Sequence, residues 1–231
     1  MNRLRSFIAL FAMVVFSALV FAETEKGDLS LTRLMNGNKR FVSGIISQKD
    51  LSDAKRKELS KGQKPFAIVL TCSDSRVSPE IIFDQGLGTI FVVRVAGNIA
   101  DPVIIRSIEY AAEHLDVPLL LILGHSQCGA VKATLELEGE ACALAQKIMP
   151  AVMAAKEKGG SEDEIIEAAI KENIKNVYKD VMSSKVINHL VSEGRLKIAA
   201  GEYSLTTGHV EMIDLPKLAP LKKPHYMKRQ K

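Results

Sequence analysis

Two cysteines and one histidine carry the strongest chemical signal in the sequence. Cys72 lies in TCSDSRV (71–77), and His125 and Cys128 lie in GHSQCGA (124–130). The spacing His-x-x-Cys allows two ligands from one tight turn to reach the same ion, and Cys72 would supply a third. Two thiolates and one imidazole suit Zn²⁺, and three protein ligands leave the fourth tetrahedral position open, as a catalytic zinc requires.

Asp74 and Arg76 follow Cys72 at alternate positions. An arginine beside a carboxylate keeps that carboxylate ionised and fixes its orientation. An ionised Asp74 aimed at a zinc-bound water would accept its hydrogen bond and leave a lone pair directed at an incoming electrophile. Because zinc lowers the pKa of such a water toward neutrality, the residues predict attack of hydroxide on a small electrophile.

Two other interpretations of the same residues remain open at this point. A structural zinc would need a fourth ligand, for which Asp74 or a remote histidine is a candidate. The other interpretation is a buried thiol pair or a Cys72–Cys128 disulfide. Proteins exported to an oxidising compartment usually pair their cysteines, and residues 1–22 predict export. The third cysteine, Cys142, is expected to be buried in an alanine-rich helix.

The elements that must position these residues follow a strand–helix alternation. Short apolar runs predict strands buried on both faces at residues 66–71, 89–94, 118–124 and 196–201. Helical patterns cover residues 103–115, 127–137 and most of 140–194, with breaks at Pro150 and at Gly159-Gly160. This order predicts an α/β fold with a mostly parallel central sheet flanked by helices. Ligands gather at the carboxyl ends of such strands, so both motifs should meet there.

The two ends of the predicted domain have patterns of their own. An N-terminal helical arm is expected to end near Gly37, followed by a lysine-rich helical linker to about Gly62. The stretch EYSLTTGHVEMI (202–213) alternates around Thr207-Gly208, which predicts an antiparallel edge strand.

Composition and the termini predict one exported domain. The 231 residues are 47% apolar and 25% charged, which is ordinary for a soluble globular protein. Residues 1–22 read as a signal peptide, with an uncleaved membrane anchor as the alternative. Residues 23–213 then form the domain and 214–231 a basic tail, and we expect a periplasmic location. Cleavage removes Arg3 and Arg5 and lowers the formal net charge from +4 to +2, which predicts no nucleic-acid partner and, after cleavage, no membrane association.

The sequence resembles the β-class carbonic anhydrases. The likeness is carried by CSDSRV (72–77), FDQGLGTIFVVRVAGN (83–98), SIEYAAEHL (107–115) and GHSQCGAVKA (124–133), and more weakly by LMNGNKRFVSG (34–44) and GEYSLTTGHVEMI (201–213). The resemblance implies that Cys72, His125 and Cys128 bind one zinc per chain. It also implies that Asp74, paired with Arg76, orients a zinc-bound hydroxide for the reversible hydration of CO₂ to bicarbonate and a proton.

The resemblance is closest to the open, plant-like subclass. Gln63 matches a glutamine that helps to bind substrate in that subclass. The matching cleft-lining positions are Phe91, Ala96 and Tyr110. Another subclass, which bicarbonate regulates, uses a tryptophan in its effector pocket, and this chain has no tryptophan. An open site is therefore expected, rather than a closed state in which Asp74 ligates zinc.

Proton transfer and assembly complete the expectations. His114 follows Tyr110 by one helical turn and is a candidate proton shuttle, although a histidine merely packed at a helix end fits equally well. The resemblance implies a homodimer or tetramer with an active site shared across the interface. Two alternatives to CO₂ hydration are a CS₂ or COS hydrolase on the same scaffold and a non-catalytic zinc-binding module.

Overall fold

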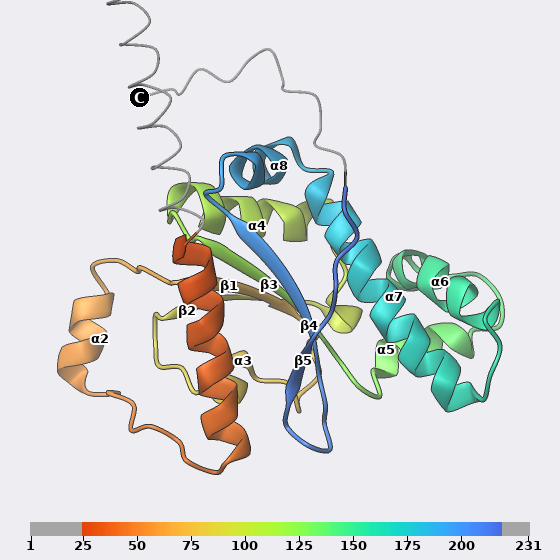
Figure 1. Ribbon diagram of the computed structural model, residues 1–231, viewed down its shortest axis with the longest axis horizontal. Coiled ribbons are helices and arrows are strands. Elements are labelled where there is room, and N and C mark those ends of the chain that lie inside the picture. Colours follow the sequence, from red (N-terminus) through yellow and green to blue (C-terminus); the bar gives the residue numbers. More distant parts are fainter. Residues whose placement is uncertain (1–24, 219–231) are drawn as a thin grey trace, which may run out of the picture.

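Five strands form the central sheet of the computed structural model, which describes residues 25–218 (Figure 1). They are β1 (Ala67–Thr71), β2 (Ile90–Arg94), β3 (Leu119–His125), β4 (Lys197–Tyr203) and β5 (Val210–Met212). The spatial order is β2-β1-β3-β4-β5, in which only β5 runs antiparallel to its neighbour. The predicted fold, a mostly parallel sheet with an antiparallel edge strand, is confirmed.

Helices lie on both faces of this sheet. The helices of the described residues are an N-terminal helix over residues 25–42, α2 (Asp53–Leu59), α3 (Pro79–Ile82), the 3₁₀ turn η1 (Ala96–Asn98), α4 (Pro102–His114), α5 (Gly129–Leu135), α6 (Ala143–Lys156), α7 (Glu162–Met182) and α8 (Lys185–Ser192). Of these, α2 has no buried residue. The predicted signal peptide and residues 219–231 of the basic tail lie outside the described residues. Within residues 25–218, no helix combines the length and the apolar character that crossing a bilayer requires.

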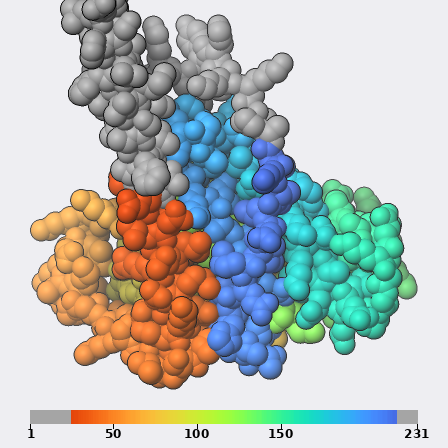
Figure 2. All heavy atoms as spheres, viewed as in Figure 1, coloured from red at the N-terminus to blue at the C-terminus, as the bar shows by residue number. Residues whose placement is uncertain are grey.

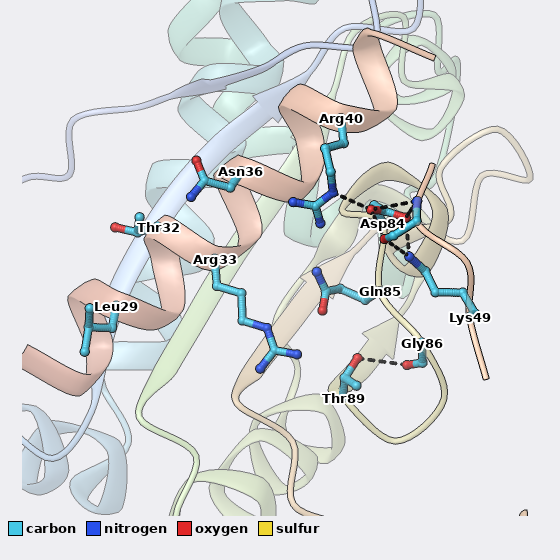
Figure 3. A pocket seen from close by; sticks show the side chains of 11 residues that line it. Leu29, Thr32, Arg33, Asn36, Arg40, Lys49, Asp84, Gln85, Gly86 and Thr89 are labelled. Atoms are coloured by element: carbon cyan, nitrogen blue, oxygen red, sulfur yellow. Dashed lines mark hydrogen bonds and ion pairs between the residues drawn. The ribbon is translucent and has the colours of Figure 1, made fainter. Parts of the chain in front are cut away.

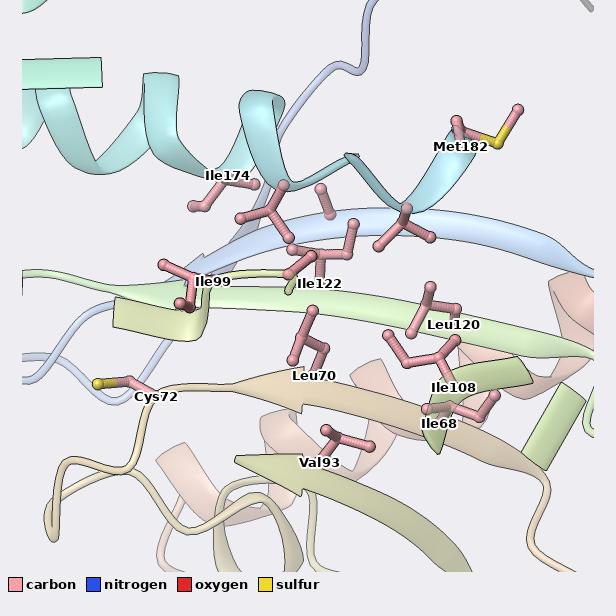
Figure 4. Packing of buried hydrophobic residues seen from close by; sticks show 14 of the residues in the cluster. Ile68, Leu70, Cys72, Val93, Ile99, Ile108, Leu120, Ile122, Ile174 and Met182 are labelled. Carbon is pink, nitrogen blue, oxygen red and sulfur yellow. The ribbon is translucent and has the colours of Figure 1, made fainter. Parts of the chain in front are cut away.

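Alternate residues of β1 face opposite sides of the sheet. Ile68 and Leu70 belong to the larger of two buried clusters, with side chains of α4, α7 and α8, whereas Val69 packs in the smaller cluster with the N-terminal helix and α3. Cys72 continues the alternation just beyond the strand and joins the larger cluster (Figure 4). The pleat of β1 therefore aims the Cys72 thiol toward the face that α7 covers.

The N-terminal helix continues past Gly37, so the predicted end there is wrong. A Cβ atom at Gly37 would lie 1.8 Å from the carbonyl oxygen of Phe83, and glycine is therefore needed for close approach rather than for termination. The helix ends at residue 42, and Gly44 follows with a left-handed φ of 68°. Residues 45–52 have no regular structure, so the predicted helical linker is reduced to α2.

Two further expectations for the helical region are wrong. Pro150 lies inside α6 without ending it. An interior proline costs a helix about 3 kcal/mol, but Ile148, Ala151 and Val152 of the same helix are fully buried, and their packing offsets that cost. Cys142 is the exposed N-cap residue of α6 and not a buried helical residue.

The N-terminal helix and the β4–β5 hairpin lie side by side on one face of the molecule (Figure 2). Buried Asn38 joins them, because its Nδ2 donates to the Gly208 carbonyl at 2.8 Å and its Oδ1 accepts from the Val210 amide at 3.0 Å. Asn38 Nδ2 also donates to the Ile82 carbonyl at 3.3 Å. One side chain thus fixes the helix against both the hairpin and α3.

A polar cavity of about 550 Å³ lies between the N-terminal helix and the loop that leads into β2 (Figure 3). Its carboxylate, Asp84, has no exposed side-chain area and accepts Arg40 Nε at 2.6 Å, together with donors from Lys49 and Ser47. A buried carboxylate is tolerated only when it is paired and hydrogen-bonded in this way. Asp84 therefore anchors the helix and the segment after it to the sheet.

Candidate metal centre

The two predicted motifs meet at the carboxyl ends of neighbouring parallel strands. Cys72 follows β1, His125 is the last residue of β3, and Cys128 caps the N-terminus of α5. Their ligand atoms lie within 4.8 Å of one another, and all three residues are buried. Among residues 25–218 this is the one group of three or more such side chains close enough to share a metal ion.

The imidazole of His125 is prepared to bind a metal through Nε2. Its Nδ1 lies 2.9 Å from the carbonyl oxygen of Ser126, and a carbonyl can only accept, so the proton is on Nδ1. Nε2 is buried without a hydrogen-bond partner. A buried ring nitrogen with a free lone pair is costly unless something binds it, and a metal ion meets that need.

The turn that presents His125 and Cys128 is held by the C-terminal hairpin. Gln127 between them has a left-handed φ of 54°, a sparsely populated conformation for a residue with a side chain. The Ser126 amide donates to the Tyr203 carbonyl at 2.9 Å, and the Leu205 amide donates to Ser126 Oγ at 3.0 Å. The loop after β4 therefore fixes the geometry of this turn.

The two neighbouring thiols have pKa values shifted in opposite directions. Hydrogen bonds from Cys128 and from the Gly97 amide, which lies 3.3 Å from Cys72 Sγ, lower the pKa of Cys72. The adjacent Cys72 thiolate and burial raise the pKa of Cys128. A divalent cation between the sulfurs would allow both to ionise, as thiolate ligands must. The donor set, its burial and the free lone pair of His125 thus fit zinc, with Cys72, His125 and Cys128 as ligands.

Asp74 lies beside these ligands and is held by Arg76. Arg76 Nε and Nη2 donate to the two carboxylate oxygens at 2.9 and 2.7 Å, and the Arg76 amide donates to Oδ1 at 2.9 Å. These bonds keep the pKa of the Asp74 carboxyl well below its usual range. Asp74 Oδ2 is 3.9 Å from His125 Nε2, so the carboxylate borders the space that a metal would occupy.

Arg94 is a functional residue that the sequence interpretation missed. Its Nε donates to the Cys72 carbonyl at 3.1 Å and its Nη2 donates to the Asp74 carbonyl at 2.7 Å. It therefore clamps the loop that carries both a metal ligand and the carboxylate. The sequence could have indicated Arg94, because it is the single charged residue of the otherwise apolar strand of residues 90–94.

The predicted cleft residues are only partly brought together. The rings of Phe91 and Tyr110 are 6.2 Å apart, and Tyr110 and His114 are 5.5 Å apart, so these side chains form one aromatic row on β2 and α4. Ala96 is half-buried in η1, next to Gly97. His114 is exposed at the end of α4.

Gln63 is not near the three ligands of its own chain. It lies before β1 and lines a groove of about 450 Å³ with Leu59 and Leu87, whereas Cys72 follows β1. A five-residue strand rises roughly 17 Å, so the length of the strand separates the two residues.

Comparisons with known proteins give the family of the chain. A carbonic anhydrase family profile matches residues 67–210. A carbonic anhydrase of Mycolicibacterium smegmatis is 38% identical over 187 residues, which cover 78% of this chain and 89% of that protein. Carbonic anhydrase 2 of Mycobacterium tuberculosis is 37% identical over 189 residues, covering 78% of this chain and 90% of that protein.

Solved structures give the class. The β-carbonic anhydrase CcaA superposes with a TM-score of 0.64 at 28% identity, covering 80% of this chain and 95% of that one. A Coccomyxa β-carbonic anhydrase in complex with acetazolamide gives a TM-score of 0.62 at 26% identity, covering 70% and 78%. With Cys72, His125 and Cys128 positioned to hold a metal ion, the chain therefore belongs to the β-class carbonic anhydrases, zinc enzymes that hydrate CO₂ reversibly to bicarbonate and a proton.

Proposed function

We propose that CO₂ hydration by this zinc enzyme depends on Asp74, held by Arg76 beside an open fourth position of the metal. The supporting observation is the geometry of the carboxylate, which accepts three hydrogen bonds from Arg76 and lies 3.9 Å from His125 Nε2. Bound zinc supplies a Lewis acid that makes water a strong nucleophile near neutral pH. Asp74 would accept a hydrogen bond from a water held there and so orient it, with a lone pair of the water oxygen facing CO₂.

The charge state of Asp74 follows from its contacts. Because hydrogen bonds from Arg76 lower the pKa of the carboxyl, Asp74 stays ionised at every pH above the ordinary aspartate value of about 3.9. Protonation of Asp74 thus cannot turn the enzyme off between about pH 6.5 and pH 9. Arg76 also donates to both carboxylate oxygens, which favours the open site over a closed one in which Asp74 ligates zinc, and Oδ2, which accepts only one of these bonds, keeps a lone pair for water.

The remaining cleft residues have roles on the substrate side. Ala96 lies in the turn beside Cys72, whereas Phe91 pairs with Ile68 at the start of β1, so Phe91 and Tyr110, like Gln63, would complete an apolar wall suited to uncharged CO₂ only in the site of a second copy. His114 is tilted against Tyr110 and exposed at the far end of α4, roughly 20 Å along that helix from the turn beside Cys72, so it would pass a proton to buffer from that second site. The rival CS₂ or COS hydrolase and the non-catalytic zinc module have no comparable support, since the matched relatives are carbonic anhydrases.

Gln63 reaches a zinc site only if a second copy of the chain supplies it. In its own chain it lies beyond the opposite end of β1 from Cys72. Large apolar side chains are 49–67% exposed on the segments around β2, which is an edge strand, and they offer a surface for a second copy. These side chains are Ile45, Ile46, Leu51, Ile81 and Leu87. The enzyme therefore works as a homodimer or a larger assembly of dimers.

We also propose that residues 1–22 are removed and that the enzyme acts in the periplasm. Arg3 and Arg5 followed by an uncharged apolar run support this. Intact mass of the protein recovered from the periplasmic fraction should correspond to a chain beginning at Glu23. Recovery of the full-length chain in the membrane fraction would contradict cleavage.

Replacing the carboxylate tests the role of Asp74. Asp74→Asn should retain one zinc per chain but slow CO₂ hydration by about 10², because a preorganised electrostatic partner is lost. The control Asp53→Asn, on the exposed side of α2, should keep the parent's rate. Stopped-flow hydration and zinc analysis give both quantities, and an unchanged rate for Asp74→Asn would remove it from the mechanism.

Subunit mixing tests whether Gln63 acts in the neighbouring site. Gln63→Ala and Asp74→Asn should each be impaired, but an oligomer that contains one chain of each has one site with both native residues. We expect that mixed dimer to recover about half of the parent's hydration rate. Mixed oligomers with only the summed residual activity of the two variants, or a single-chain mass in light scattering, would contradict the shared site.

A further inference from the structure

The sulfur of Cys72 accepts a hydrogen bond from a backbone amide of another segment of the chain. The Gly97 amide lies 3.3 Å from Cys72 Sγ, in the turn η1 between β2 and α4. Gly97 has a left-handed φ of 66°, and a Cβ atom at this position would lie 2.7 Å from Ile148 Cδ1. Because glycine is free to adopt many φ/ψ values, contacts from outside the turn are what can hold Gly97 in this one conformation.

Asn173 of α7 makes that contact. Its Nδ2 donates to the carbonyl oxygen of Gly97 at 2.9 Å, across 76 positions of sequence. The side chain is 2% exposed, so the bond is shielded from water. Asn173 thus holds the acceptor side of the residue whose amide donates to Cys72.

The surroundings of Asn173 argue against a purely packing role. The buried face of α7 around it is otherwise apolar, with Ile166, Ala169, Ile170, Ile174 and Val177. The second polar atom of the amide, Oδ1, is buried without a hydrogen-bond partner. Burying an amide with only one group satisfied is less favourable than an apolar residue of similar size. Stability alone would therefore favour leucine here.

We propose that Asn173 is a positioning residue for the zinc centre. Asn173 acts through Gly97 on the Cys72 thiolate. By holding the Gly97 carbonyl it fixes the φ and ψ angles of Gly97 and so keeps the N–H of the preceding peptide on the sulfur, which withdraws electron density from the thiolate and holds it in place for the metal. Hydrogen-bonded partners of ligands commonly change metal affinity by 10–100-fold. The proposal rests on Cys72 as a zinc ligand and is independent of the role proposed for Asp74.

Two pairs of matched variants separate positioning from stability. Asn173→Leu and Asn173→Ala remove the amide from the chain of contacts to Cys72. Asn188→Leu and Asn188→Ala make the same changes in α8, where another buried asparagine, 6% exposed, donates to the Met182 carbonyl at 3.4 Å. The alanine variants serve if leucine prevents folding.

The test reads the metal site directly in the full mature protein. Zinc dissociation constants come from competition with a chromophoric chelator, and the thiolate-to-Co²⁺ charge-transfer band comes from the cobalt-substituted protein. The Asn173 variants should bind zinc about tenfold more weakly or worse, with the band at longer wavelength because the sulfur is more electron-rich. The Asn188 variants should lose stability but keep the parent's affinity and band.

Two results would overturn the proposal. One is an Asn173 variant that retains the parent's zinc affinity and charge-transfer band. The other is an equal change in the Asn188 variants, which would mean that general destabilisation is responsible. A parent protein without any thiolate band would instead overturn Cys72 as a ligand, whereas a slow Asp74→Asn enzyme with a normal band leaves this proposal intact.

Discussion

The zinc site depends on the parallel register of β1 and β3. Thr71 pairs with Leu123, and Thr71 Oγ1 donates to the Leu123 carbonyl at 2.9 Å, so the two strands end side by side. Cys72, which follows β1, and the turn that begins at His125, the last residue of β3, consequently face one small volume. A shift of one residue in either strand would turn its side chains to the opposite face and separate the ligands.

Contacts from the surrounding elements then limit how each ligand can move. The loop after β4 fixes the turn at Ser126, Arg94 of β2 clamps the loop after β1, and η1 places a donor on Cys72. Each contact comes from a different part of the chain, which couples folding of the whole sheet to the site. Such coupling suits a buried set of two thiols and an imidazole, because zinc needs them preorganised and both thiols ionised.

Much of this architecture could be predicted because it depends on local patterns. Buried strands are short apolar runs, and soft ligands at strand ends are rare enough to be noticed. The errors arose where a contact between distant parts of the chain decided the structure. Glycine is needed at position 37 because the Phe83 carbonyl approaches it closely, and not because the helix ends there. Pro150 is tolerated inside α6 because the buried face of that helix is packed. Asn173 was not singled out in the sequence, because the Gly97 carbonyl that it contacts lies 76 positions away. Gln63 lies at the opposite end of β1 from the metal ligands of its own chain, so a single chain does not show which zinc site it would serve.

We infer that a three-ligand zinc site with Asp74 held by Arg76 hydrates CO₂ while it remains open. The most direct measurement is stopped-flow CO₂ hydration, with zinc content determined on the same samples, from about pH 6.5 to about pH 9. We expect one zinc per chain throughout and a rate that declines gradually toward low pH. Full zinc occupancy with a rate no faster than buffer, or an abrupt loss of activity below about pH 8, would contradict it.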